Sequence, residues 1–208
     1  MSETQGRTAD ILEALEARWR EHGAPIAGRL APGLAEDELA ARFRPLGSAL
    51  PDELRLWWGR HDGVRRFQPG TRLGTESQVG PGGWELLSLD EALSERALML
   101  KLCGRPHYPA DDRDWDGYWR PSWMPLFAFD ANLVFANLDG ATDVGVPLHL
   151  WAAQPEDVGV AHTASLTDLL AIWERLLGER YYWWSADEGR WEDRRPEVPM
   201  SLIHAGLL

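Results

Sequence analysis

The sequence predicts an α+β fold, with helices in its first third and strands grouped in its second half. Three helical patterns lie between residues 8 and 63, and three apolar segments of strand length lie between residues 123 and 151. A further amphipathic helix is predicted at residues 165–178. Because the strands follow one another without helices between them, an antiparallel meander is the economical connection.

The first helix is expected at about residues 8–22, where Ile11, Leu12, Leu15 and Trp19 form an apolar stripe. Gly23 and Pro25 end this helix. A second helix is predicted at residues 34–44, before Pro45 and Gly47.

The stretch from Leu50 to Gly63 carries a full set of helix signals. Pro51 suits the first helical position, and Gly63 suits the left-handed position just after a helix. Four residues with helical spacing share one face: Leu54, Trp57, Trp58 and His61. A short helix with two buried tryptophans is the prediction.

Later segments complete the fold. A short strand at residues 84–87 leads into the capping box Ser88–Glu91, which opens a helix ending near Leu102. Strands are predicted at residues 123–127, 133–138 and 144–151. The middle strand is apolar on both faces, as expected of a central strand. Pro147 indicates an edge or a bulge in the third.

The C-terminal part contains one more clear helix, opened by the capping residue Ser165 and ended by Gly178. A short strand is expected near residues 181–184. The 208 residues therefore predict one domain, at residues 8–184, followed by a C-terminal tail at residues 185–208.

The charge, the apolar runs and the cysteine content limit the kinds of function that the sequence suggests. A net charge of −12 argues against sequence-independent binding to DNA or RNA, which requires clustered lysine and arginine. An acidic surface steers basic partners, although general solubility explains the charge equally well. No apolar run approaches the roughly 18 residues of a membrane span. A polar N-terminus and a single cysteine, Cys103, predict a cytoplasmic protein.

An acidic segment with aromatic anchors is the expected partner-binding surface. Its candidates are Asp111, Asp112, Asp114, Trp115, Asp116 and Trp119, together with Asp130 further on. Aromatic side chains supply affinity at interfaces, and carboxylates supply specificity. The pattern from Asp112 to Gly117 also resembles the start of a calcium loop. Trp123 occupies the position that needs a bidentate glutamate, so calcium is not expected.

Catalytic and metal-binding motifs are not found in the sequence. The six histidines show no zinc spacing, and the Gly80–Gly83 tract lacks the lysine of a phosphate-binding loop. His61-Asp62 resembles the metal pair of phosphohydrolases, but a structural role at a helix end is preferred. A buried structural thiol is preferred for Cys103. We therefore expect a protein without catalytic residues, metal or cofactor.

The order of these features resembles the SUKH superfamily, which is typified by the fungal Smi/Knr cell-wall-assembly regulators. The segments that carry the resemblance are Leu50-Pro51, Leu54-Arg55, Trp58, His61–Gly63, Trp84–Leu87, Leu89–Ala92, Trp123, Pro125, residues 133–140, Leu150-Trp151 and residues 165–177. The match covers residues 11–184. It departs from the family before the central strand, where Phe129-Asp130-Ala131-Asn132 replaces a glycine-rich tract.

The resemblance implies a twisted, mainly antiparallel sheet flanked by helices, and a non-enzymatic binding function. Bacterial members are similar to immunity proteins that neutralise polymorphic toxins, often nucleases. We therefore expect a protein partner, a basic toxin domain, which an acidic surface suits. A regulatory scaffold of the cell-wall-assembly or signalling type is the alternative, and a hydrolase using His61 and Asp62 is a third.

Overall fold

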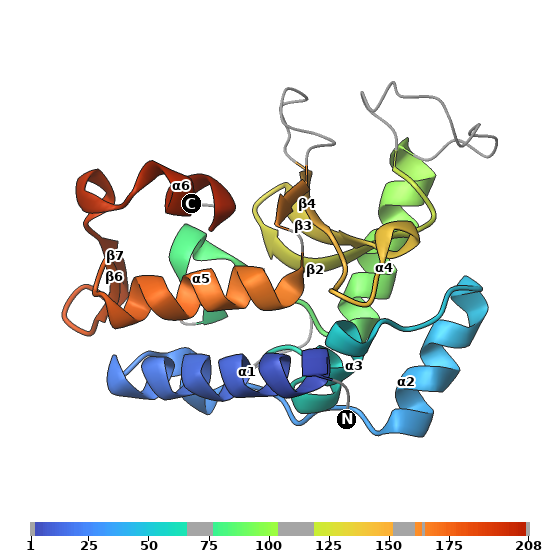
Figure 1. Ribbon diagram of the computed structural model, residues 1–208, viewed down its shortest axis with the longest axis horizontal. Helices are drawn as coiled ribbons and strands as arrows, with labels where there is room; N and C mark the ends of the chain where they lie inside the picture. The colour runs from blue at the N-terminus through green and yellow to red at the C-terminus, as the bar shows by residue number, and fades with distance from the viewer. Residues whose placement is uncertain (1–2, 66–76, 104–118, 152–160, 164, 207–208) are drawn as a thin grey trace.

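The computed structural model describes residues 3–65, 77–103, 119–151, 161–163 and 165–206 (Figure 1). The α-helices are α1 Glu3–Glu21, α2 Glu36–Phe43, α3 Asp52–Arg60, α4 Leu89–Cys103, α5 Leu166–Gly178 and α6 Met200–Ala205. The strands are β1 Glu85–Leu86, β2 Trp123–Phe129, β3 Asn132–Asn137, β4 Leu148–Trp151, β5 Ala161–Thr163, β6 Tyr182–Ser185 and β7 Arg190–Asp193. Short 3-10 turns include η1 Pro25–Gly28, η2 Arg44–Leu46, η4 Pro81–Gly83, η5 Leu138–Gly140 and η7 Arg195–Glu197.

Mixed helix and antiparallel sheet confirm the α+β prediction. Five of the described strands pair in the order β1-β2-β3-β4-β5, and β6 pairs with β7 in a separate hairpin. β3 is the central strand, as its apolar sequence predicts. The pairings of β2 with β3 and of β3 with β4 form the predicted meander. The register shifts between Pro125 and Phe127, a bulge of the kind in which a strand tolerates proline.

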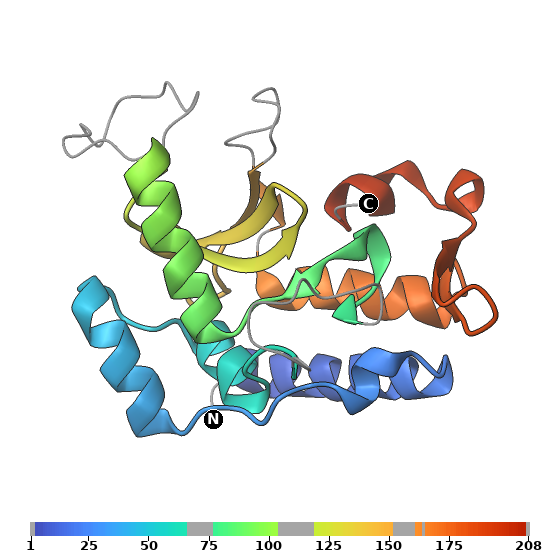
Figure 2. The ribbon, with the colours of Figure 1, turned by 180° about the vertical axis from the view of Figure 1, so that it is seen from behind.

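Different helices cover the two faces of the sheet. Val134 and Ala136 of β3 join the large core, which residues of α1, α3 and α5 complete. Leu133 and Phe135 point to the other face, where Met99 of α4 packs against them. Figure 2 shows α4 in front of the sheet, and α1 and α5 lie side by side in both views. The alternation of side chains along a strand thus gives β3 two apolar faces.

Helix α3 is held in the core by the residues that the sequence predicts. Leu54, Trp57 and Trp58 are fully buried. The helix ends at Arg60, and His61 is extended. Gly63 has the expected positive φ of 77°, but it lies beyond the C-cap, so the expected helix stop is wrong. Its Cα approaches the next helix start so closely that a Cβ would lie 2.7 Å from the backbone N of Ser88.

Side-chain caps begin α4 and α5 as the sequence predicts. Ser88 N donates to Glu91 Oε2 at 2.9 Å, and Glu91 N donates to Ser88 Oγ at 3.2 Å. Ser165 Oγ accepts from Asp168 N at 3.0 Å. Each cap satisfies an N–H that has no partner within its helix.

Residues 185–206 pack against the rest of the chain. The boundary expected after residue 184 falls inside the β6–β7 hairpin, where Trp184 pairs with Trp191. Val198 lies in the main core, and Trp173 Nε1 donates to the carbonyl of Gly206 at 2.9 Å. This segment therefore contributes to the same core as residues 8–184. None of the helices in the described part of the chain has the length and apolar character that crossing a membrane requires.

Candidate functional site

Most of the residues predicted to bind a partner are not among those that the structure describes. Asp111, Asp112, Asp114, Trp115 and Asp116 lie outside the described residues. Asp130 is exposed at the turn between β2 and β3, where it has a positive φ of 54°.

Trp119 does not lie on the surface where the sequence predicts an anchor. Its side chain is only 1% exposed. The ring centroid lies 5.3 Å from that of Trp123, 5.0 Å from Phe135 and 5.6 Å from Trp151. Since aromatic packing of this kind is stabilising, Trp119 serves the core beneath α4, and the expected exposed anchor is wrong.

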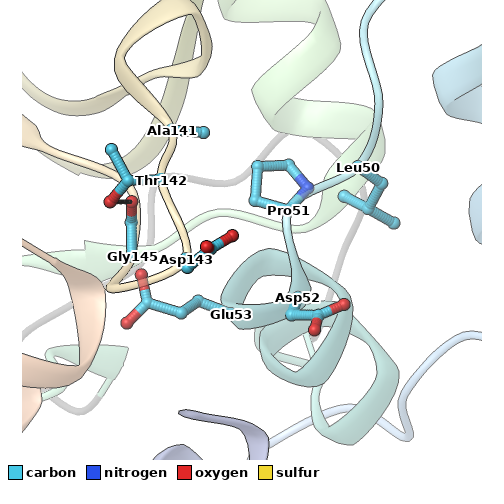
Figure 3. A pocket seen from close by; sticks show the side chains of 8 residues that line it. All are labelled: Leu50, Pro51, Asp52, Glu53, Ala141, Thr142, Asp143 and Gly145. Atoms are coloured by element: carbon cyan, nitrogen blue, oxygen red, sulfur yellow. Dashed lines mark hydrogen bonds between the residues drawn. The ribbon is translucent and has the colours of Figure 1, made fainter. Parts of the chain in front are cut away.

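An open pocket lies where the start of α3 meets the loop that follows η5. Its volume is about 480 Å³. The lining residues are Leu50, Pro51, Asp52 and Glu53 on the helix side, and Ala141, Thr142, Asp143 and Gly145 on the loop side. Figure 3 shows Pro51 between the helix start and the loop, the Glu53 carboxylate beside Gly145, and the Asp52 side chain directed away from the loop. We call this pocket the acidic pocket.

Local sequence shapes both walls. Pro51 is extended, with φ −60° and ψ 146°, and Asp52 follows in the first helical turn, where negative charge is favoured. On the loop side, Thr142 N donates to Gly145 O at 2.9 Å, and Gly145 N donates to Thr142 O at 3.2 Å. This reciprocal turn leaves Asp143 and Val144 exposed. The sequence gives no signal that these two segments meet.

The buried carboxylate of Glu53 closes one end of the acidic pocket. It is 1% exposed. Oε2 accepts from Val146 N at 2.9 Å and from Leu166 N at 3.3 Å, and Oε1 accepts from Thr167 N at 2.9 Å and from the Thr167 hydroxyl. Hydrogen bonds at the positive end of a helix stabilise a carboxylate. Glu53 therefore joins α3 to the start of α5.

Two carboxylates of the acidic pocket are exposed to solvent. The Asp52 side chain is 47% exposed and lies 3.8 Å from Nε of Arg55. Asp143 is exposed on the opposite segment. Leu50 and Pro51 add apolar surface to the lining. This combination suits a cationic side chain with an apolar stem, such as arginine or lysine.

A second pocket of about 410 Å³ lies among α1, α2 and α3. Its apolar lining comes from residues such as Leu34, Leu39 and Leu56. The charged groups at its edge are already paired, Arg55 with Glu36 and Arg60 with Glu16. Because its lining includes Arg55 and Arg60 as well as Glu36, it is less suited than the acidic pocket to a cationic partner.

His61 and Asp62 make structural contacts. His61 Nε2 lies 2.8 Å from Glu16 Oε1, and Asp62 Oδ1 accepts from Leu89 N at 2.7 Å. Burial raises the pKa of Asp62, although the Leu89 hydrogen bond opposes that effect. No cluster of three or more His, Cys, Asp or Glu suited to a metal ion occurs within the described ranges. The preferred structural interpretation of this pair agrees with these contacts.

Sequence reasoning did not identify the acidic pocket. In the sequence, Asp52 and Glu53 stand at a predicted helix start, where negative charge is favoured, and Asp143 lies between two predicted strands. Glu53 lies four residues before Trp57, on the buried side of the predicted helix, and a carboxylate at this position is the signal that could have marked it. Comparison of the chain with protein-family models and with curated proteins finds no match.

Proposed function

We propose that this protein is a non-enzymatic protein-binding domain of the SUKH type, and that it acts as a bacterial immunity protein that neutralises a cognate polymorphic toxin. The observation that carries the proposal is the acidic pocket, which exposes Asp52 and Asp143 in a chain of net charge −12. A basic partner such as a nuclease domain is attracted by such a surface, and its own nucleic-acid site is blocked once bound.

Several of the residues that carry the family resemblance are buried, which supports a role for them in maintaining the fold of a binding protein. Leu54, Trp58, Leu87 and Trp123 are all buried. Trp58 Nε1 donates to the carbonyl of Leu87 at 3.3 Å. Such residues maintain the core and leave the exposed surface free to vary with the partner. The antiparallel sheet with helices on both faces is also the architecture that the resemblance implies.

The chemistry of the acidic pocket favours binding over catalysis. The Glu53 carboxylate is engaged by donors from Val146, Leu166 and Thr167. The Thr142 hydroxyl donates within its own turn, to the carbonyl of Gly145 at 3.3 Å. A general base needs a free lone pair within reach of a substrate proton. The exposed carboxylates of Asp52 and Asp143 instead contribute negative charge at the surface, which suits a cation.

The decisive experiment looks for a toxin domain encoded beside the gene and tests it directly, and the absence of any such domain would count against the immunity role. Co-expression is expected to restore growth of cells that produce this toxin, and the purified pair is expected to bind less tightly at 200 mM than at 50 mM salt, as electrostatically steered complexes do, by about tenfold. The double variant Asp52→Asn/Asp143→Asn is expected to slow association about tenfold. It is expected to lower the unfolding temperature only slightly, because Asp52 is an exposed charge in the first turn of α3.

Two matched controls locate the contact. Asp187→Asn neutralises an exposed carboxylate in the β6–β7 turn, which lies at the other end of the molecule (Figure 1). Asp130→Asn tests the residue that the sequence predicts. Neither is expected to slow association. Unchanged binding by the pocket variant would exclude the pocket as the contact. Capture of housekeeping proteins in place of a toxin would favour the regulatory scaffold.

A further inference from the structure

A buried polar chain links α1, α5 and α3 and ends at the acidic pocket. Thr8 Oγ1 lies 2.7 Å from Thr167 Oγ1, and the Thr167 hydroxyl donates to Glu53 Oε1. All three residues are at most 1% exposed. Hydroxyl and carboxylate groups are costly to bury, so a fully bonded chain of them indicates a specific structural requirement.

The direction of each hydrogen bond follows from the chemistry. A carboxylate that takes these hydrogen bonds only accepts, so the Thr167 hydroxyl must donate its one proton to Glu53. The Thr167 oxygen then accepts, and Thr8 is the donor to it. The Thr8 hydroxyl proton therefore points to Thr167, and α1 is linked through Thr167 to Glu53 at the end of the pocket.

Glu53 also holds the loop wall of the acidic pocket. A single oxygen, Oε2, accepts from Val146 N at the end of the loop and from Leu166 N at the start of α5. Gly145 lies so close that a Cβ there would be 2.7 Å from Oε2 and 2.4 Å from Ser165 Cβ. Asp143 stands two residues before Gly145, so its place depends on this contact.

Hydrogen bonds, without an ion pair to any described residue, stabilise the carboxylate of Glu53. Among the described residues, no arginine, lysine or histidine forms an ion pair with it. A buried charge held in this way depends strongly on the donors that surround it. A substitution that removes the carboxylate is expected to weaken the hydrogen bonds from Val146 and Leu166. The loop that forms one wall of the pocket would then be held less firmly.

We propose that Glu53 is a positioning residue of the acidic pocket: it fixes residues 141–146 against α3, and so sets Asp143 on the wall opposite Pro51 for a cationic side chain. The inference rests on the proposed function, because it concerns the same pocket. It adds a residue that a partner cannot contact, and a connection to Thr8 on α1.

The structural test is hydrogen–deuterium exchange of single amides in the full chain. Glu53→Gln keeps one acceptor but places an NH₂ against backbone donors, so exchange of the Val146 amide is expected to rise at least about tenfold. Thr167→Val replaces the hydroxyl by a methyl group of similar size and leaves the backbone hydrogen bond to Glu53 in place, so a smaller increase is expected at the Thr167 amide. Glu91→Gln is the matched control, because Glu91 also accepts a backbone N–H, but at the start of α4.

The binding test uses N-acetylarginine methylamide as probe and follows backbone amide shifts of the folded protein. The wild type is expected to show shifts at Asp52, Thr142 and Asp143. Glu53→Gln is expected to weaken this binding at least about fivefold, and Glu91→Gln to leave it unchanged. A residue that only stabilised the fold would lower the unfolding temperature without changing the affinity of the folded fraction.

The two proposals fail in different ways. If the arginine probe shifts no pocket amide in the wild type, the pocket is not a cation site, while the exchange result still decides the role of Glu53. If Asp52→Asn/Asp143→Asn abolishes binding but Glu53→Gln retains wild-type exchange at Val146 and wild-type affinity, the positioning role is overturned. Should Glu53→Gln not fold, wild-type exchange and affinity in Thr167→Val would overturn it equally.

Discussion

The carboxylate of Glu16 on α1 and the imidazole of His61 just after α3 are joined by a hydrogen bond, with 2.8 Å between Oε1 and Nε2. Arg60 Nε donates to the same oxygen at 2.5 Å. Burial acts to raise the pKa of Glu16, but the hydrogen bonds from Arg60 and His61 outweigh it and hold the pKa below its usual value. The helix-end histidine therefore anchors α3 to α1.

The lowered pKa of Glu16 predicts a loss of stability in acid. A carboxyl whose folded pKa is depressed stabilises the fold above its ordinary pKa of 4.5, and that contribution is lost as the pH falls through the folded value. Glu16→Gln is expected to lower the free energy of unfolding by about 1–3 kcal/mol at pH 7, and by less in acid. Urea unfolding between about pH 3 and 7 measures both.

Glu21→Gln is the control for this prediction, because Glu21 pairs with Arg18 at the exposed end of the same helix. Solvent screening makes that pair a weak contributor. Parallel stability curves for wild type and Glu16→Gln across this pH range would contradict the assigned role of Glu16.

The ionisation of Asp62 is expected to affect stability in the direction opposite to that of Glu16. Burial raises the pKa of Asp62, so the charged form is less favourable in the folded protein, and this penalty appears as the pH rises above the ordinary value of 3.8. Asp62→Asn keeps an oxygen that can accept from Leu89 N, and is expected to be neutral or stabilising at pH 7. Asp62→Ala loses this cap of α4 and is expected to cost about 1 kcal/mol. Thermal unfolding of the two variants distinguishes them, and equal losses would count against the cap.

Gly145 is predicted to tolerate no side chain. Its φ of 156° and the contacts of a Cβ with Ser165 and Glu53 require movement of the loop. Gly145→Ala is therefore expected to destabilise the protein by about 2–4 kcal/mol. Gly28→Ala is the matched change, since nothing lies within 4 Å of a Cβ there. A Gly145→Ala variant as stable as Gly28→Ala would show that the loop adapts freely.

Local signals in the sequence predicted the elements that depend on neighbouring residues. The Ser88–Glu91 box and the Ser165 cap form as predicted because each acts within one helical turn. The two apolar faces of β3 placed it at the centre of the sheet. Such features are predictable because a few consecutive residues are enough to produce them.

Features that depend on distant segments were not predictable in this way. Trp119 has polar neighbours in the sequence, yet the fold brings Phe135 and Trp151 against it. The acidic pocket joins Asp52 to Asp143, and neither segment marks the other. Strands β5 and β7 and helix α6 were missed because three to six residues contain too short a pattern to identify.

The packing of residues 185–206 predicts that this segment contributes to stability. Val198 is 6% exposed in the main core, whereas Met200, two residues later, is 66% exposed. Val198→Ala is expected to lower the free energy of unfolding by about 1–3 kcal/mol, because buried methyl groups are removed. Met200→Ala removes more atoms from the surface and is expected to change it by less than about 0.5 kcal/mol. Equal stability of the two variants in urea unfolding would mean that the segment does not pack on the core in solution. A loss confined to Val198→Ala would show that residues beyond 184 fold with the domain.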